Sequence, residues 1–230
     1  MTPSIDGVTH TFAEHGLYNG LFLMRDEETG TFWDHLTGEA VYGPQVGTAL
    51  ELANLLHSRA GQVLENDPDA LIALSDRAMR ADEDMEPRSL LARVGGRLSR
   101  MFLRTVKEED DRLPTMDIGL GIWAGEEARY YSYERVVAED RAVLDSFQGK
   151  RTLVFLDPSS YVLSAFLVDA DGLRWDGDVL RLSNDQYVEG SVLYDPDGTR
   201  ASDARPLQIF TRWYGFSLTF PDTEIYAERR

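Results

Sequence analysis

Cysteine is absent from this sequence of 230 residues. A cysteine nucleophile, a thiol redox pair, an iron–sulfur cluster and a cysteine-bound zinc ion are therefore excluded for the chain as it stands. The absence does not fix the cellular compartment, because proteins without disulfides occur on both sides of a membrane. Nucleophile-elbow, P-loop, zinc-protease and EF-hand motifs are missing as well. The sequence therefore assigns no reaction, and it leaves open whether the protein is an enzyme.

Basic residues are scarce, with 23 arginines and lysines against 40 aspartates and glutamates and a net charge of −17. A field of this sign repels the phosphate backbone of a nucleic acid, and it also disfavours an anionic membrane surface. We therefore expect no nucleic-acid partner. The composition identifies neither a small molecule nor a protein as the partner, and it is compatible with a homo-oligomer.

Long apolar runs are missing too. None approaches the roughly 20 residues that a membrane-spanning helix needs, so we expect no membrane span. The first residues contain neither the basic segment nor the apolar stretch of a signal peptide. The sequence as it stands therefore predicts a cytoplasmic protein, and an incomplete N-terminus would remove the basis for that prediction.

The composition is that of an ordinary globular protein, with 43% hydrophobic and 27% charged residues. Short apolar and aromatic runs alternate with turns rich in glycine, aspartate and proline, a pattern typical of strands and hairpins. We predict an α+β fold dominated by strands, with two β-rich halves in one compact unit. The expected halves are residues 1–75, with a short strand over 70–74, and residues 111–230.

Helices are predicted in three places. A short helix follows residue 57. A polar loop and an amphipathic helix occupy 76–110, because apolar residues recur at helical spacing over 89–106 and Ser89 can cap the first turn. An aromatic segment predicts a C-terminal helix over 209–220, which a proline then ends.

Three of the four tryptophans lie in segments rich in apolar residues. We expect the side chains of Trp33, Trp123 and Trp213 to be buried for that reason. A tryptophan that proved to be exposed would instead mark a binding surface.

The N-terminus predicts a hairpin with its turn at Asp6-Gly7. Because little chain precedes this turn, the strand that follows it would be an exposed edge. We therefore hypothesise that the chain begins late. The alternatives are a short first strand within residues 1–5 or a second subunit that covers the edge. The side chains that would lose cover are Val8, Phe12, Leu17 and Phe22.

All four histidines precede residue 58, and three of them flank predicted neighbouring strands. Imidazole and carboxylate groups on adjacent strands can hold a divalent metal ion, the one cofactor that the pattern suggests. No two histidines have the close spacing of a typical zinc site, so surface or hydrogen-bonded histidines are the alternative. The candidate metal ligands are His10, His15 and His35. The candidate ligand-binding residues are Tyr18, Asn19, Asp26, Trp33, Asp34 and Glu39.

Asp34 and His35 are neighbours in the sequence. A carboxylate beside an imidazole favours the protonated ring and suits the pair to acid–base catalysis. Consecutive residues of a strand point to opposite faces, however. The two side chains can act together only if a turn begins at Asp34.

Gly119, Gly121 and Ala124 match the loose dinucleotide-binding pattern G-x-G-x-x-A. That pattern functions where a helix begins directly after the glycines and receives the pyrophosphate. Here Glu126, Glu127 and a strand-like segment follow, and the two carboxylates would repel a phosphate. We therefore reject a dinucleotide site.

Several blocks of the sequence resemble one prokaryotic family, and together they extend over nearly the whole chain. The family is known as domain of unknown function 3179. The blocks are residues 10–26 (HTFAEHGLYNGLFLMRD), 28–33 (ETGTFW), 36–44 (LTGEAVYGP), 112–123 (RLPTMDIGLGIW), 128–131 (ARYY), 212–216 (RWYGF) and 220–226 (FPDTEIY).

The resemblance implies no activity, but it implies a difference from typical members. Those members have an additional segment upstream of residue 10, with a Cys-Pro-x-Cys-like pair and in some cases selenocysteine. Such a pair suits redox or soft-metal chemistry. This chain either lacks that chemistry or begins after a selenocysteine codon. Three hypotheses follow: a ligand-binding or structural protein, the downstream part of a thiol or selenol redox protein, and a histidine-based metal enzyme.

Overall fold

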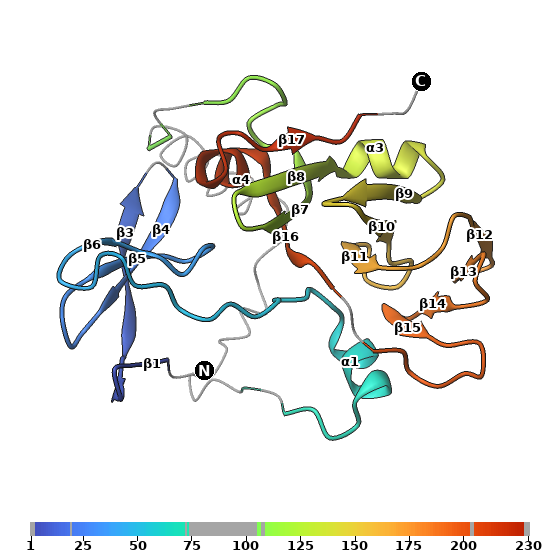
Figure 1. The fold of residues 1–230 in the computed structure, drawn as a ribbon, viewed down its shortest axis with the longest axis horizontal. Coiled ribbons are helices and arrows are strands. Elements are labelled where there is room, and N and C mark those ends of the chain that lie inside the picture. The colour runs from blue at the N-terminus through green and yellow to red at the C-terminus, as the bar shows by residue number, and fades with distance from the viewer. Residues whose placement is uncertain are drawn as a thin grey trace, which may run out of the picture. The chain divides into compact units, whose positions relative to one another are not determined.

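The structure is a computed structural model that describes residues 3–18, 20–71, 73, 105–106, 109–202 and 205–227. Strands dominate it and helices are few, which confirms the predicted α+β class. The chain divides into two compact units, drawn in Figure 1. The first unit comprises Met1–Glu51 and Ala70–Glu109, and the second comprises Leu52–Asp69 and Asp110–Arg230. The boundaries that the sequence suggested at 75 and 110 stay a prediction.

A small hairpin and a four-stranded antiparallel meander build the described part of the first unit. The hairpin turns at Asp6 and Gly7, whose φ angles of 51° and 78° lie in the left-handed region that such a turn requires. Trp33, Ile5 and Ala40 form the buried core of this unit. The strands are β1 (Ser4–Ile5), β2 (Val8–Thr9), β3 (Phe12–Tyr18), β4 (Leu21–Asp26), β5 (Phe32–Asp34) and β6 (Ala40–Tyr42).

The apolar side chains expected at an uncovered edge are largely exposed. β3 is an edge strand of the meander, and Val8, Leu17 and Phe22 have exposed fractions of 52%, 42% and 52%. Phe12 instead packs partly buried against the core around Trp33. β1 supplies the short first strand that the sequence offered as an alternative, and the late start of the chain stays a prediction.

Three sheets build the described part of the second unit. One has the strand order β16-β7-β8-β17, the next β11-β10-β9, and the third is the meander β12-β13-β14-β15. All the pairings are antiparallel except that of β17 with β8. The strands are β7 (Ile118–Ala124), β8 (Glu127–Ser132), β9 (Ala142–Phe147), β10 (Lys150–Leu156), β11 (Leu163–Leu167), β12 (Leu173–Asp176), β13 (Val179–Leu182), β14 (Tyr187–Glu189), β15 (Val192–Tyr194), β16 (Leu207–Arg212) and β17 (Glu224–Ile225).

β10 lies between two apolar cores. Val154 and Leu156 belong to one buried cluster, whereas Leu153 and Phe155 belong to another. Successive side chains of a strand point to opposite faces, so both faces of β10 are buried. This explains why the sequence of the strand contains a continuous run of apolar residues, in which polar and apolar residues do not alternate.

The predicted C-terminal helix exists, but it begins later than expected. The first residues of the segment 209–220 belong to β16, which pairs with β7 from Leu207↔Trp123 to Arg212↔Ile118. α4 (Trp213–Thr219) follows directly. Ile209 and Thr211 are β-branched and favour a strand, and the aromatic residues around them concealed the change of period.

Other helix and strand predictions have mixed outcomes. The short helix after residue 57 is α1 (Ala60–Asn66), and α3 (Tyr133–Ala138) was not predicted. The described residues of 70–74 form no strand, and Leu71 is 99% exposed. The predicted helix over 89–106, with its cap Ser89, lies outside the described residues apart from 105–106.

Among the helices that the structure describes, none combines the length and the apolar character needed to cross a membrane.

Three buried tryptophans and Gly121 contribute to the packing within the units. Trp33, Trp123 and Trp213 are 0%, 8% and 0% exposed, which confirms their predicted burial. A Cβ atom on Gly121 would lie 2.1 Å from the ring of Phe216 in α4. The glycine therefore lets the helix approach the sheet closely, and β7 continues through it as a strand.

Candidate functional site

The turn between β4 and β5 is organised by the carboxylate of Asp26. Its Oδ1 atom accepts hydrogen bonds from the backbone N–H of Thr29 at 2.5 Å and of Gly30 at 3.2 Å. The Thr29 hydroxyl also donates to Oδ1, at 2.8 Å. Gly30 has a φ of 72°, a conformation that glycine adopts at little cost. This local sequence therefore holds the Asp26 side chain in one position.

Asp26 carries a buried negative charge. Both Asp26 and Trp33 are 0% exposed, and Trp33 Nε1 donates to Asp26 Oδ2 at 2.8 Å. Burial by itself would raise the pKa of Asp26, but the hydrogen bonds from Trp33 and Thr29 outweigh it and lower the pKa to about 2. The carboxylate is therefore ionised at neutral pH inside the first unit.

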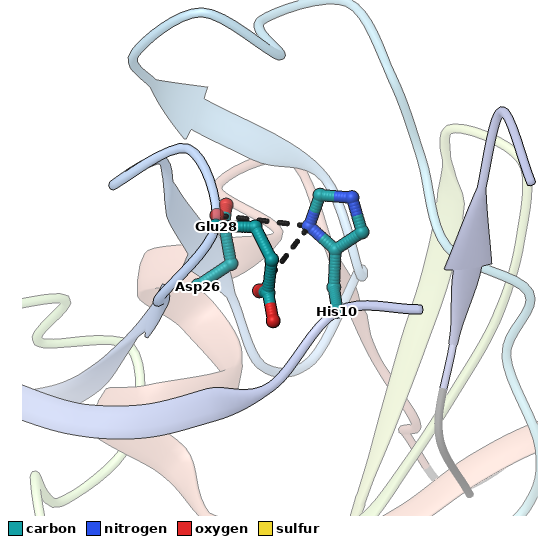
Figure 2. A group of neighbouring side chains, drawn as sticks. All are labelled: His10, Asp26 and Glu28. Atoms are coloured by element: carbon teal, nitrogen blue, oxygen red, sulfur yellow. Dashed lines mark ion pairs between the residues drawn. The ribbon is translucent and has the colours of Figure 1, made fainter. Parts of the chain in front are cut away.

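His10 faces this charge from the connection between β2 and β3. Figure 2 shows its Nδ1 atom directed toward two carboxylates, 3.6 Å from Asp26 Oδ1 and 3.8 Å from Glu28 Oε2. Both distances are longer than a hydrogen bond. His10 is 3% exposed, and its Nδ1 has no hydrogen-bond partner among the described residues. Such an unsatisfied buried nitrogen costs about 1–3 kcal/mol, so the arrangement favours a further group between the three side chains.

Glu28 forms the third side of the group. Its two carboxylate oxygens accept the backbone N–H of Thr11 at 3.1 and 2.9 Å. This hydrogen bond lowers the pKa of Glu28, and burial opposes it only in part. The Glu28 side chain is 29% exposed, so solvent reaches the group from this side.

The three side chains offer the ligands of a metal site. One imidazole nitrogen and two carboxylate oxygens lie within 4.8 Å of one another, and no second such trio occurs in the part of the chain that the structure describes. An ion about 2.1 Å from each of two ligands that are 3.6–3.8 Å apart would see them at an angle of about 120–130°. That angle fits a distorted tetrahedral site. A mixed nitrogen and oxygen set suits Zn²⁺ or Mn²⁺.

Comparison with known proteins identifies the family. The family model described as "Protein of unknown function (DUF3179)" matches residues 2–215. The chain belongs to the DUF3179 family. This confirms the resemblance seen in the sequence. No curated protein and no solved structure shows a significant match.

The family description assigns no activity, so the function of this DUF3179 member has to be argued from its site. The upstream cysteine or selenocysteine chemistry that the resemblance implied stays a prediction.

The structure brings only one of the three candidate histidines to the carboxylates. His15 lies on β3, and its ring packs edge-on against Phe32 with centroids 5.1 Å apart. His35 Nδ1 lies 3.0 Å from the carbonyl oxygen of Phe22. The two histidines therefore make other contacts, whereas His10 joins Asp26.

A turn does begin at Asp34, the condition that the acid–base hypothesis required. The Asp34 carboxylate, however, accepts the backbone N–H groups of Leu36 at 2.7 Å and Thr37 at 3.0 Å. Its oxygens thus stabilise the turn itself. No hydrogen bond or ion pair joins Asp34 to His35 in the described structure.

The other candidate ligand-binding residues do not converge on one place. Trp33 supports Asp26 from the core, whereas Tyr18 is 67% exposed. Glu39 is exposed and pairs through its backbone with Ala49. Asn19 lies outside the described residues.

Glu28 is the site residue that sequence reasoning missed. In the sequence it stands directly before Thr29-Gly30, which indicates only a turn. The only available signal was its position two residues after Asp26, which does not reveal that the turn folds back onto Thr11.

Proposed function

We propose that the first unit binds one divalent transition-metal ion, Zn²⁺ or Mn²⁺, through His10 Nδ1, Asp26 and Glu28. The observation that carries the proposal is the buried His10 Nδ1 atom, which faces two carboxylates without a hydrogen bond of its own. A bound cation would satisfy this nitrogen and offset the negative charge of the two acids.

An ion pair between a protonated His10 and the carboxylates is the competing explanation. An imidazolium forms its strongest contact as a short N–H···O hydrogen bond of about 2.7–2.9 Å. The observed 3.6 and 3.8 Å separations instead leave room for an ion among the three groups. The hydrogen bonds from Thr29 to Asp26 and from Thr11 to Glu28 are consistent with a bound metal ion, because ligating carboxylates are themselves held by hydrogen bonds.

The ligand count indicates an open site. Structural zinc sites close the coordination sphere with four protein ligands, whereas sites that act on a substrate keep a position for water. Three protein ligands are present among the residues that the structure describes, and the exposed side at Glu28 leads to solvent. Water would complete the coordination there.

Metal binding can be tested on the untagged full chain after treatment with a chelator. We expect isothermal titration with Zn²⁺ and with Mn²⁺ to show one site per chain, and His10→Ala to weaken binding by at least about 100-fold. Glu28→Gln, which changes a partly exposed side chain, should weaken binding without affecting the fold. His15→Ala and His35→Ala are the matched controls and should bind as the wild type does.

Three results would contradict the proposal. The first is wild-type protein that binds neither ion. The second is a His10→Ala variant that keeps the wild-type affinity, and the third is a loss of affinity in His15→Ala or His35→Ala instead.

A further inference from the structure

The second unit contains a cavity of about 220 Å³, separate from the residues of the metal site. All of its described lining residues belong to this unit. They come from α1 and its flanking residues, β7, β11 and the segment before it, β15 and its flanking residues, and β16 and the segment before it. A water molecule occupies about 30 Å³ of liquid, so the cavity has room for about seven waters. A compact organic molecule of similar size would fit.

The cavity is rich in positive charge for so acidic a protein. Arg200 and Arg205 both line it and His57 lines it too, whereas Asp67 is the single carboxylate among the described lining residues. The whole chain has a net charge of −17. Two guanidinium groups on one small cavity therefore point to an anionic ligand.

Arg205 is held in place by the surrounding structure. Its Nη1 atom donates to Ser164 Oγ at 2.7 Å, and its Nη2 atom donates to the Ser191 carbonyl oxygen at 2.7 Å. The guanidinium carbon lies 3.8 Å from the centre of the Phe166 ring. These contacts fix the plane of the guanidinium, and a fixed plane lowers the entropic cost of binding a carboxylate.

A buried carboxylate orders the polar part of the wall. Asp157 is 1% exposed, and its Oδ2 atom accepts hydrogen bonds from the hydroxyls of Ser160 and Ser191, both of which line the cavity. Gln62 Nε2 donates to the same oxygen at 2.6 Å. The two serine side chains are thus held in position before any ligand arrives.

Apolar side chains form the remaining wall. Leu120, Leu163 and Val192 are buried core residues that also line the cavity, and Phe210 adds an aromatic ring. A small, mostly apolar cavity with a few fixed polar groups is the usual form of a small-molecule site.

We propose that this cavity binds a small organic carboxylate with a short apolar body. Arg205 and Arg200 bind the carboxylate, and the wall of Leu163, Val192 and Phe210 receives the apolar part. The site belongs to the second unit and does not depend on the proposed metal ion.

Matched pairs of probes can test the charge requirement on the full chain. We would titrate benzoate against benzamide, and isovalerate against isovaleramide, by calorimetry and by ligand-observed NMR. The acids should bind with Kd values of about 1–10 mM, as expected for probes of this size. The neutral amides, which have nearly the same shape, should bind about tenfold more weakly or not at all.

Variants locate the binding in the cavity. Arg205→Gln and Arg200→Gln should each weaken benzoate binding about tenfold, and Arg200 is exposed, so its variant should keep the fold. Val63→Trp places a large ring on an exposed lining position of α1 and should block the cavity. Arg174→Gln removes an exposed arginine that does not line the cavity and is the control.

Equal binding of acids and amides would overturn the proposal. So would the absence of binding at 10-fold above the expected Kd range, or affinities that Arg200→Gln, Arg205→Gln and Val63→Trp all leave unchanged. A loss in Arg174→Gln equal to that in Arg205→Gln would show general charge attraction and would also overturn it.

Discussion

Replacing Asp157 with asparagine should destabilise the second unit by an amount that depends on pH. Asp157 directly follows β10 and is 1% exposed. Its Oδ2 atom accepts hydrogen bonds from Gln62, Ser160 and Ser191, and its Oδ1 atom accepts the backbone N–H and the hydroxyl of Ser159, both at 2.8 Å. In Asp157→Asn, one of these oxygens becomes an NH₂ group that faces other donors.

The magnitude follows from the pKa of Asp157. Burial by itself would raise this pKa, but the hydrogen bonds from Gln62, Ser191 and Ser159 lower it from 3.8 to about 2. Because the folded-state pKa lies below the unfolded value, the ionised side chain stabilises the native state fully above about pH 5. That contribution is lost as the pH falls through about 2. It amounts to about 2 kcal/mol at pH 7 and about 1 kcal/mol at pH 3.

Urea unfolding followed by tryptophan fluorescence, at pH 7 and at pH 3, measures this difference. The free energy of unfolding of Asp157→Asn should be at least about 2 kcal/mol below that of the wild type at pH 7, and this deficit should be about 1 kcal/mol smaller at pH 3. Asp178→Asn changes an exposed acid and should match the wild type at both values. A cost below about 0.5 kcal/mol at pH 7, or a cost that does not change with pH, would refute the reasoning.

Two further changes probe the packing of α4 on the sheet. Trp213→Ala removes a fully buried ring whose Nε1 donates to the Asp110 carbonyl oxygen at 2.9 Å. We expect the free energy of unfolding in urea to fall by about 3–5 kcal/mol. A decrease under about 1 kcal/mol would contradict the burial of this ring. Gly121→Ala should cost about 1–3 kcal/mol or more, because the new methyl group would lie 2.1 Å from Phe216. Gly61→Ala in α1 meets no atom within 4 Å and should be neutral or stabilising by up to about 1 kcal/mol, so equal effects of the two alanines would be inconsistent with the packing described.

The sequence predicted elements well where one physical signal dominated. The sequence of β10 is a clear strand signal, because both of its faces are buried and the apolar run is therefore uninterrupted. The end of β16 was missed because no glycine or proline separates it from α4. Only the pairing with β7 decides that the strand continues to Arg212. A period that changes within one aromatic segment cannot be located from composition.

The candidate metal site shows where local reasoning stops. From residue type alone, His10 and Asp26 can be identified as candidates, but His15 and His35 are equally good candidates. The distinction arises from the pairing of β3 with β4, which sets Phe12 opposite Asp26. This register brings Thr11 onto the Glu28 carboxylate and so places His10 beside it.

That contact joins residues 17 positions apart in the chain, and no motif spacing encodes it. Glu28 is therefore a sharper test of the structure than His10. A metal bound by histidines alone would survive Glu28→Gln, whereas a metal held by the folded turn would not.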